Sequence, residues 1–251
     1  MYAFLLIGQS NMSGRGSLAE LTDISRENIF VLREEGWEKA VEPVVRDRPF
    51  SAQGLSLTFA NCVHMLTGED IGLIPASLGG SPIKDWQPGE ALFENAVAAA
   101  ERAVSMGAKL AGILWHQGES DSLRKEDVSV YRERLSAMTE EIKKRTDALK
   151  EAYPDGVLSP LPFLMGELGG YLDRNPDSLY HREVNEIMHA FVKDKPEFAV
   201  TKANDLKDKG DLLHFSTLSL RRLGLRYANL WADIVFSKEK SCPDGTVGEY
   251  L

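Results

Sequence analysis

Short apolar runs alternate with amphipathic helical patterns along most of the chain, and this alternation limits the possible folds most. The runs have the length and β-branched content of buried strands, and Gly or Pro borders many of them. Strands are predicted at residues 2–7, 28–32, 71–77, 109–115, 161–168 and 197–201. Helices are predicted at 55–66, 91–106, from about 126 onward, 178–193 and 217–236. This order predicts a parallel sheet covered by helices on both faces.

The size and charge of the chain narrow the class of protein further. With 251 residues, 43% hydrophobic and 27% charged, it is typical of a soluble α/β protein, and we predict one domain over 1–251. The polar segment at about 237–251 is predicted to form a C-terminal tail. The net charge of −9 makes the chain a poor general binder of nucleic acid or of an anionic membrane, so neither is expected as a partner.

Targeting and redox signals favour a reduced, cytoplasmic protein. No uncharged apolar stretch reaches the roughly 18 residues that a transmembrane helix needs. The apolar run at 2–7 is too short for a signal peptide and has no basic flank. Cys62 and Cys242 are far apart in the sequence, and neither has the spacing of a metal ligand, so no metal site is expected.

Four polar segments stand where a parallel sheet places its ligand site, beyond the carboxyl ends of the strands. Three of them directly follow predicted strands, and the fourth precedes the last helix. They are residues 8–16, 78–86, 115–121 and 211–216. These segments are therefore where catalytic side chains are expected.

The four segments supply the groups that an acyl-transfer enzyme needs: a hydroxyl nucleophile, a base and a group that orients the base. Ser10 can serve as the nucleophile because it follows the first strand beside a glycine, where the backbone can turn sharply. His214 can serve as the base, and Asp211, three residues earlier, can orient its ring. Asp205 and Asp208 lie in the same charged loop, and Asp211 is preferred to them on spacing.

The same segments also supply donors for an oxyanion. The backbone N–H groups of Ser10 and Gly80 can donate, with Gly79 as the weaker alternative to Gly80. The side-chain amide of Gln117 is the predicted third donor. The alternative for Gln117 is a buried amide with a structural role.

The order of the four motifs resembles a known group of enzymes. They are GQSNM at 8–12, GGSPIKDW at 79–86, WHQGESD at 115–121 and DLLH at 211–214. This pattern resembles the SGNH (GDSL-type) hydrolase superfamily, and within it the sialate O-acetylesterase-like and carbohydrate acetylesterase branch that includes acetyl xylan esterases. The wider superfamily has asparagine where Gln117 stands, and the carbohydrate-esterase branch shares the glutamine.

The resemblance implies a flavodoxin-like, three-layer α/β/α fold whose parallel sheet has about five strands, and a Ser-His-Asp triad that uses no metal or organic cofactor. By motif position it implies Ser10 as nucleophile, His214 as acid–base residue, Asp211 as its orienter, and Ser10, Gly80 or Gly79, and Gln117 as oxyanion donors.

The function expected from the motifs is a serine esterase that hydrolyses O-acetyl esters through an acetyl-Ser10 intermediate. A small acetylated carbohydrate is the expected substrate. Two alternatives stay open on the sequence. One is an esterase or thioesterase of another small acyl group, and the other is a carbohydrate-binding protein without catalysis on the same fold.

Further residues in the motifs are candidates for shaping the site or touching substrate: Gln9, Asn11, Arg15, Gly79, Trp86 and Glu119. Arg15 can bind a substrate carboxylate or phosphate, or pair with an acidic neighbour. Trp86 and Trp115 can offer a flat face to a sugar ring, or lie in the core. For Glu119 a structural hydrogen-bonding role is favoured.

Two neighbours of these candidates are expected to be structural. Asp121 is expected to cap a helix or to brace its loop. His116 is next to Gln117, and alternation along an extended segment points the two side chains to opposite faces, which argues against His116 as the base.

Overall fold

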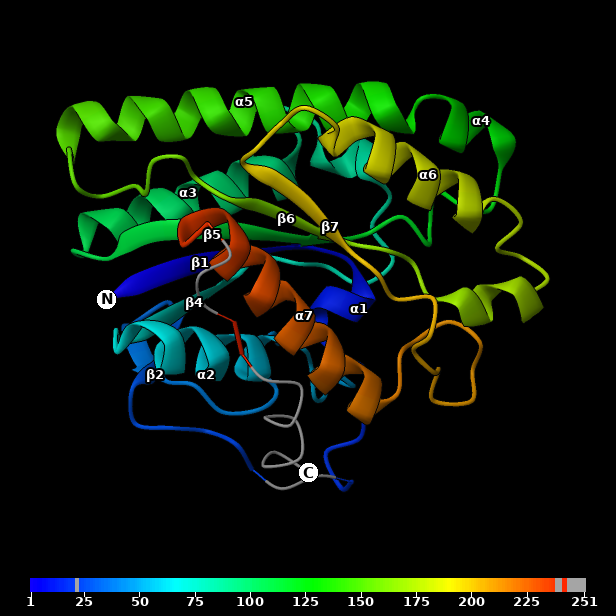
Figure 1. The fold of residues 1–251 in the computed structure, drawn as a ribbon, viewed down its shortest axis with the longest axis horizontal. Helices are drawn as coiled ribbons and strands as arrows, with labels where there is room; N and C mark the ends of the chain where they lie inside the picture. Colours follow the sequence, from blue (N-terminus) through cyan, green and yellow to red (C-terminus); the bar gives the residue numbers. More distant parts are fainter. Residues whose placement is uncertain (21–22, 238–240, 243–251) are drawn as a thin grey trace.

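A computed structural model describes residues 1–20, 23–237 and 241–242. In these residues seven strands form one sheet in the order β3-β2-β4-β1-β5-β6-β7. The strands are β1 (Tyr2–Gly8), β2 (Ile29–Arg33), β3 (Gly36–Lys39), β4 (Ile71–Pro75), β5 (Lys109–His116), β6 (Phe163–Gly166) and β7 (Phe198–Thr201). Figure 1 shows helices on both faces of this sheet, which confirms the three-layer α/β/α architecture.

The sheet is parallel apart from one edge strand. β3 pairs antiparallel with β2, with Leu32 opposite Trp37, while every other neighbouring pair is parallel. All six predicted strands are present, and β3 is the addition, so the sheet is larger than the expected five or so strands. A turn of two residues before Gly36, which has a φ of 132°, joins β2 to β3.

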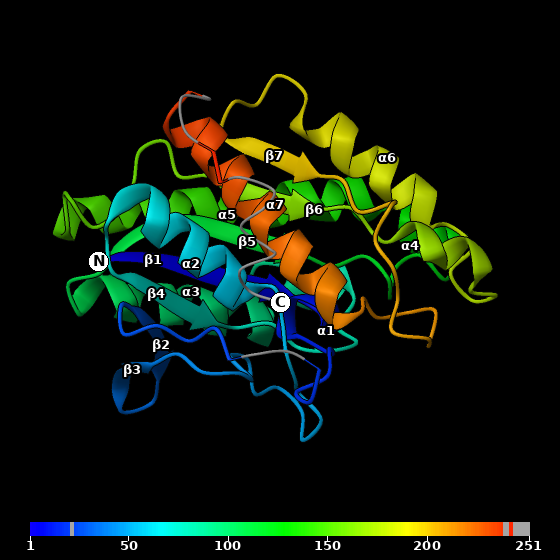
Figure 2. The same cartoon turned by 60° about the horizontal axis from the view of Figure 1, so that its bottom comes forward.

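Two helices cover one face of the sheet, and the others cover the opposite face and one end. α2 (Ser56–Thr67) packs against α7 (Thr217–Val235) on the face that comes forward in Figure 2. α3 (Ala91–Ser105) and α5 (Tyr131–Ala152) lie behind the sheet, and α6 (His181–Val192) packs beside α5 and β7. The remaining elements are α1 (Ser10–Ser13), α4 (Lys125–Ser129) and the 3₁₀ turns η1 (Ile83–Trp86) and η2 (Gly170–Arg174).

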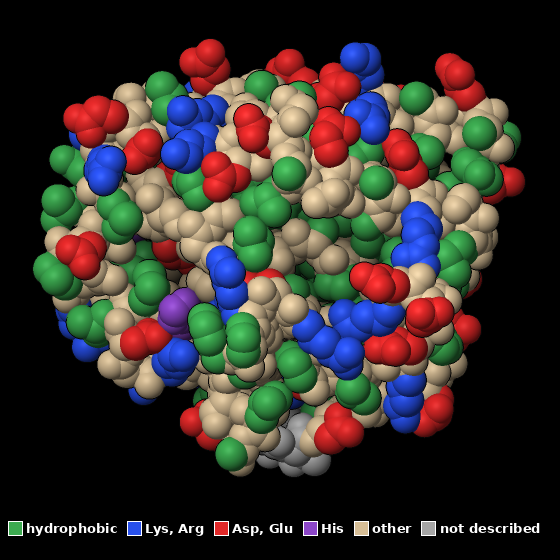
Figure 3. Space-filling view, turned by 180° about the vertical axis from the view of Figure 1, so that it is seen from behind, with side chains coloured by type: hydrophobic (Ala, Val, Ile, Leu, Met, Phe, Trp, Pro, Cys, Tyr) green, Lys and Arg blue, Asp and Glu red, His purple; other side chains and the backbone are tan. Residues whose placement is uncertain are grey.

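The long helix predicted from about residue 126 is divided in two. Val130, between α4 and α5, has φ −108° and ψ 0°, which lies outside the helical region and interrupts the helical hydrogen bonds. The ring of Tyr131 then enters the core at the start of α5. The outer side of α5 is solvated, and Figure 3 shows acidic and basic side chains interleaved along the edge that it forms.

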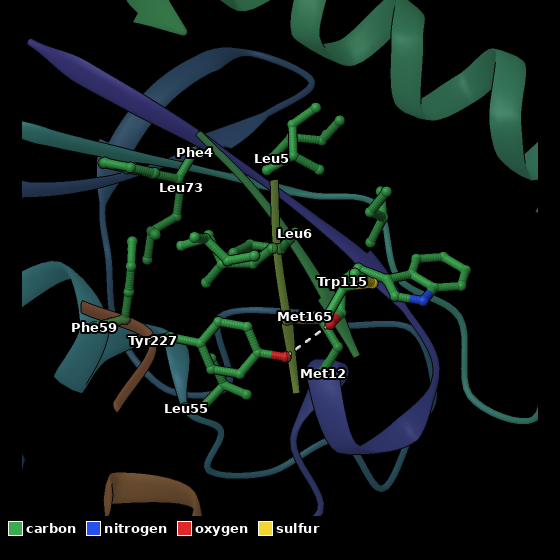
Figure 4. Packing of buried hydrophobic residues seen from close by; sticks show 14 of the residues in the cluster. Phe4, Leu5, Leu6, Met12, Leu55, Phe59, Leu73, Trp115, Met165 and Tyr227 are labelled. Carbon is green, nitrogen blue, oxygen red and sulfur yellow. Dashed lines mark hydrogen bonds between the residues drawn. The ribbon is translucent and has the colours of Figure 1, made fainter. Parts of the chain in front are cut away.

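The core is built around β1, whose central place in the sheet buries it on both faces. Phe4 meets Phe59 of α2 edge to face at 4.8 Å between ring centroids. Figure 4 shows Met12 of α1 beside Trp115 and Met165, so the short helix is anchored in the core by its own side chain. The Tyr227 hydroxyl of α7 donates to the carbonyl oxygen of Trp115 at 2.7 Å, which satisfies a buried polar group.

Cys62 of α2 and Cys242 lie in contact although they are distant in sequence. Both cysteines are buried. The pKa of the Cys62 thiol is raised, first by a hydrogen bond with Cys242 and then by burial. The backbone N–H of Cys242 donates to Asn229 Oδ1 at 2.7 Å. This part of the predicted tail is therefore packed on α7, and residues 238–240 and 243–251 lie outside the described residues.

None of the helices in the described ranges is both long enough and apolar enough to cross a membrane.

Candidate active site

Ser10 stands at the carboxyl end of the central strand, where the chain turns from β1 into α1. Gly8 has a φ of 128°, and a Cβ at this position would lie 2.2 Å from the carbonyl oxygen of His116. Only glycine fits this turn without moving β5. The turn places Ser10 at the first position of α1 and opens it to the end of the sheet where β4 and β5 also finish.

Ser10, His214 and Asp211 are joined by two hydrogen bonds. His214 Nε2 lies 3.0 Å from Ser10 Oγ, and His214 Nδ1 lies 2.7 Å from Asp211 Oδ2. The other carboxylate oxygen, Asp211 Oδ1, accepts from the backbone N–H groups of Leu213 and His214 at 3.0 and 2.8 Å. The carboxylate is thereby fixed, and its second oxygen faces Nδ1 of the imidazole, with Lys209 Nζ 3.6 Å away.

The loop that carries the base is held by Asp208, one of the two acids set aside in favour of Asp211. Asp208 Oδ2 accepts from the backbone N–H groups of Gly210 and Leu212, each at 2.9 Å. Ser216 then caps α7 by accepting from the N–H of Ser219. Asp205 is paired with Arg226 on the surface. Asp211, which was preferred because of its spacing from His214 in the sequence, is therefore the aspartate that contacts the histidine.

The pKa values of Asp211 and His214 are shifted in directions that allow His214 to act as a base. Burial raises the pKa of Asp211, but hydrogen bonds from His214 and from the Leu213 backbone outweigh it, so the net pKa is lowered and the carboxylate is charged. The pKa of His214 is lowered by burial, against the opposite pull of Asp211. The imidazole is therefore neutral at neutral pH, with Nε2 available to accept a proton.

The backbone N–H groups of Ser10 and Gly80 line the pocket and have no acceptor among the described residues. Gly80 has a φ of 81° and open space where a side chain would stand. The N–H of Gly79, the weaker alternative, is occupied because it donates to Asp47 Oδ2 at 2.7 Å. The geometry therefore leaves Ser10 and Gly80 as the pair that can meet a developing oxyanion.

Arg15 is paired with an acid. It makes a bidentate contact to Asp47, with Nη1 and Nη2 at 3.0 and 2.7 Å, and the two side chains are 3% and 2% exposed. The same carboxylate accepts from the N–H of Gly79 and from Ser51 Oγ. These contacts outweigh the effect of burial and lower the pKa of Asp47. The pair fixes the Gly79–Gly80 turn, and Asp47 was missed because its only sequence signal is its place between two arginines.

Beneath Ser10 lies a buried polar cluster. Asn11 Nδ2 donates to Glu119 Oε1 at 2.5 Å and to the Leu213 carbonyl at 3.2 Å. Burial raises the pKa of Glu119 to about 7. His116, whose Nε2 is 3.7 Å from Glu119, has its pKa lowered by burial to about 3, and its Nδ1 faces Tyr227. His116 is thus neutral and enclosed, in agreement with the expectation that it is not the base.

Gln117 lies elsewhere than expected. It is fully buried, and Nε2 donates to the Ser81 carbonyl at 3.1 Å and to Asp121 Oδ2. Its Oε1 accepts from the Tyr131 hydroxyl at 3.2 Å. This is the structural alternative left open by the sequence, and it corrects the assignment of Gln117 as an oxyanion donor. Asp121 also accepts from the N–H of Ile83 at 2.9 Å and is a brace between two loops.

Trp86 and Trp115 are likewise core residues. Their rings meet edge to face at 5.6 Å between centroids, and both are buried. The indole N–H of Trp86 donates to Ser81 Oγ at 2.9 Å. The structure thus corrects the candidate role of Trp86 in contacting a sugar.

A cavity of about 630 Å³ opens above Ser10 and His214, within the range of small-molecule sites. Gln9, Gly80 and Glu119 line it near the triad. Its mouth is formed by residues that the sequence did not single out: Arg48, Phe50, Ser120, Leu123, Arg124 and 175–179. Residues 175–179 begin with Asn-Pro, a sequence that indicates a loop but does not indicate a functional site.

In the described parts of the chain, no group of three or more His, Cys, Asp or Glu side chains is placed to hold a metal ion. The constellation is a hydroxyl, a neutral imidazole, a charged carboxylate and two free N–H donors around a cavity. Together these groups can attack an acyl carbonyl, move a proton and stabilise the resulting negative charge.

Comparisons with known proteins find relatives over most of the chain. Residues 1–233 match the family described as carbohydrate esterase, sialic acid-specific acetylesterase. A probable carbohydrate esterase of Arabidopsis thaliana is 28% identical over 252 residues, which cover 91% of this chain and 89% of that protein. The X-ray structure of that protein is similar with a TM-score of 0.80, 25% identity and coverage of 92% of this chain and 98% of that chain.

Two further solved structures share the fold. NanS is 16% identical, with a TM-score of 0.75 and coverage of 95% of this chain and 98% of that chain. A carbohydrate acetylesterase from Xanthomonas citri is 19% identical, with a TM-score of 0.64 and coverage of 95% of this chain and 57% of that chain.

Proposed function

The chain belongs to the carbohydrate esterase family of sialic acid-specific acetylesterases, and from that premise we propose that it removes O-acetyl groups from a small carbohydrate through an acetyl-Ser10 intermediate. The observation that carries the proposal is the position of His214, hydrogen-bonded to Ser10 Oγ on one side and to Asp211 on the other. This is the arrangement that a serine nucleophile needs for activation at neutral pH.

Acylation begins when Ser10 Oγ attacks the acetyl carbonyl carbon and its proton passes to His214 Nε2. The carbonyl π electrons move onto oxygen, and the N–H groups of Ser10 and Gly80 donate to the oxyanion. When the tetrahedral intermediate collapses, the bond to the sugar oxygen breaks. His214 gives its proton to that oxygen, so the sugar leaves as a neutral alcohol and acetyl stays on Ser10.

Deacylation repeats the sequence with water. His214 Nε2 takes a proton from water while the water oxygen attacks the acetyl carbon. Collapse of the second tetrahedral intermediate breaks the bond to Ser10 Oγ, and His214 returns the proton to Ser10. Asp211 remains charged throughout and stabilises the imidazolium form of His214.

The first experiment compares wild type with Ser10→Ala on p-nitrophenyl acetate, with a chelator present. We expect wild type to turn over and Ser10→Ala to lose activity by several orders of magnitude, because the acyl acceptor is gone. Equal and slow rates in both proteins would overturn the proposal. Sugar binding without Ser10-dependent turnover would instead identify a binding protein.

A second experiment determines which acyl group the protein prefers. Acetyl and hexanoyl esters of the same alcohol are given to wild type, followed by acetylated neutral sugars and acetylated sialic acid. We expect acetyl to be preferred. Phe50, Leu123 and Leu179 form an apolar rim at the mouth of the cavity, and preference for hexanoyl would assign that rim to a longer acyl chain and reject the acetyl assignment.

A further inference from the structure

We propose that the side-chain amide of Gln9 is the third oxyanion donor, and that its Nε2–H group hydrogen-bonds the acetyl oxygen of the tetrahedral intermediate. The proposal rests on the serine esterase function given above. It replaces Gln117 with the residue directly before the nucleophile, and it gives Gln117 the role of holding that residue in place.

The direction of the Gln9 amide is fixed by its oxygen. Oε1 accepts from the backbone N–H groups of Ser120 and Gly118 at 3.2 and 3.4 Å, and from Gln117 Nε2 at 3.3 Å. A backbone N–H can only donate, so the end of the amide that faces these groups must be the oxygen. Rotating the amide by 180° would oppose nitrogen to two backbone donors. The Nε2 group is therefore turned away from the loop after β5.

The nitrogen end of this amide has no protein acceptor among the described residues. The hydrogen bonds of the Gln9 side chain there are all made by its oxygen, and the residue lines the cavity. Gln9 lines the cavity together with Ser10 and Gly80, whose N–H groups are also without an acceptor among the described residues. Three donors without an acceptor in the described part of the protein, all lining the cavity beside one nucleophile, point to a ligand oxygen as their common acceptor.

The backbone of Gln9 is held as firmly as its side chain. Its N–H donates to the His116 carbonyl at 2.9 Å, and its carbonyl accepts from Met12 and Ser13, each at 3.0 Å. The amide therefore needs no reorganisation when charge develops on the substrate. Donors fixed in advance are the ones that stabilise an oxyanion most effectively.

Gln117 is not available for this task. The two hydrogens on its Nε2 are directed at the Ser81 carbonyl and at Asp121, with the Gln9 oxygen as a third, longer contact. It is enclosed and does not line the cavity. Gln117 is thus a positioning residue, which supports the oxygen of Gln9 from beneath.

The test uses Gln9→Glu and Gln9→Met in the full chain. Gln9→Glu keeps an oxygen for the N–H groups of Gly118 and Ser120 but removes the donor, and Gln9→Met removes both while keeping the shape. Gln87→Glu is the matched control, because Gln87 lies outside the cavity and its amide donates to the Ile83 carbonyl. Measured quantities are kcat and KM on p-nitrophenyl acetate, Tm, and the inhibition constant of phenylboronic acid, which forms a tetrahedral adduct with a serine hydroxyl.

We expect both Gln9 variants to lose about 10²–10³-fold in kcat, with KM changed by less than about threefold, because the contact is made in the transition state. The inhibition constant of the boronic acid rises by a similar factor, and Tm stays close to wild type for Gln9→Glu. A kcat within twofold of wild type in Gln9→Met overturns the proposal. So does a loss of kcat in both variants with unchanged affinity for the boronic acid.

The two proposals fail in different ways. If wild type shows no Ser10-dependent turnover, the esterase function is rejected. If wild type depends on Ser10 but the Gln9 variants keep their kcat, the esterase stands and only the role of Gln9 is rejected.

Discussion

The side-chain oxygen of Asn11 accepts a hydrogen bond from the backbone N–H of Phe215 at 3.1 Å. Asn11 follows Ser10 and Phe215 follows His214, so this hydrogen bond connects the two segments that carry the proposed nucleophile and base. The amide nitrogen of Asn11 completes the tie by donating to the Leu213 carbonyl and to Glu119. The spacing between Ser10 and His214 is therefore maintained by a neighbour that takes no part in the chemistry.

Replacing Asn11 by Ala is expected to lower both stability and turnover. The Phe215 N–H loses its acceptor and Glu119 loses a donor, while the Leu213 carbonyl keeps the Tyr171 hydroxyl. The loss costs about 1–3 kcal/mol in the free energy of unfolding. Urea unfolding and kcat measure the two effects. Asn28→Ala is the control, because Asn28 is exposed and donates to Asp70 at the surface, and it should stay within about 0.5 kcal/mol of wild type. Unchanged stability and kcat in Asn11→Ala would contradict this role.

The pH dependence of kcat/KM is expected to rise with pH and level off below the usual histidine range. Only neutral His214 can accept the proton of Ser10, so the rate falls as pH falls through its pKa. Burial lowers that pKa from 6.5, which places the midpoint below 6.5. The exposed His189, which contacts Glu167, supplies the control His189→Gln, and its profile should match wild type. A midpoint above 6.5 would show that the pKa of His214 is not lowered.

Asp211→Asn is expected to reduce kcat by about 10²–10⁴-fold with little change in Tm. The amide oxygen can still accept from the backbone N–H groups of Leu213 and His214. Its NH₂ group then faces His214 Nδ1 as a donor, which places the imidazole proton on Nε2 and blocks transfer from Ser10. Asp205→Asn, at an exposed pair with Arg226, is the matched control. Equal kcat in the two variants would remove Asp211 from the triad.

Glu119 is expected to make stability depend on pH. Burial raises its pKa to about 7 in the folded protein, against 4.5 for the ordinary group, so the folded state favours the protonated form. Its contribution is complete below pH 4.5 and is lost as pH rises to about 7, by on the order of 3 kcal/mol.

Glu119→Gln removes this titration while keeping an acceptor for Asn11. Urea unfolding between pH 4.5 and 8 should therefore show a smaller decline for the variant than for wild type. Parallel curves for the two proteins would mean that Glu119 keeps its ordinary pKa.

Asp47→Ala is expected to cost about 3–5 kcal/mol, because it leaves the buried guanidinium of Arg15 without its partner. Thermal and urea unfolding measure the loss. Asp147→Ala on α5 removes exposed pairs with Lys143 and Lys150 and should cost less than about 1 kcal/mol. Similar losses in the two variants would show that the Arg15–Asp47 pair contributes no more than a surface pair.

The layers of the fold could be predicted because the spacing of apolar residues along a whole helix or strand shows whether that element is buried on one face or on both. The edge strand β3 could not, because it is four residues long and its side chains are half-buried or exposed, so no alternation marks it. The division of the long helix at Val130 was equally hidden. Val128, Tyr131 and Leu135 are all buried, so the apolar spacing continues across the break and does not mark it.

Candidates for the proposed triad could be selected from the sequence because a nucleophile, a base and an orienting acid each allow few residue types. The neighbouring glutamines show the opposite case. Gln9 and Gln117 both follow strands that end at the site, and their roles depend on which amide reaches Ser81, Asp121 and Tyr131. Asp121 is local, but Ser81 precedes Gln117 by 36 residues and Tyr131 is on α5. Local spacing carries no information about these two partners.

The placement of Ser10 directly after the first strand also affects synthesis of the protein. The base that completes the site arrives 204 residues later, which at ordinary translation rates is about 10–40 s of elongation. Until then β1 lacks β4 and β5, its two neighbours in the sheet, and the serine has no histidine. A nascent chain is therefore inert toward esters, and esterase activity in a translation reaction would report molecules completed at least through His214.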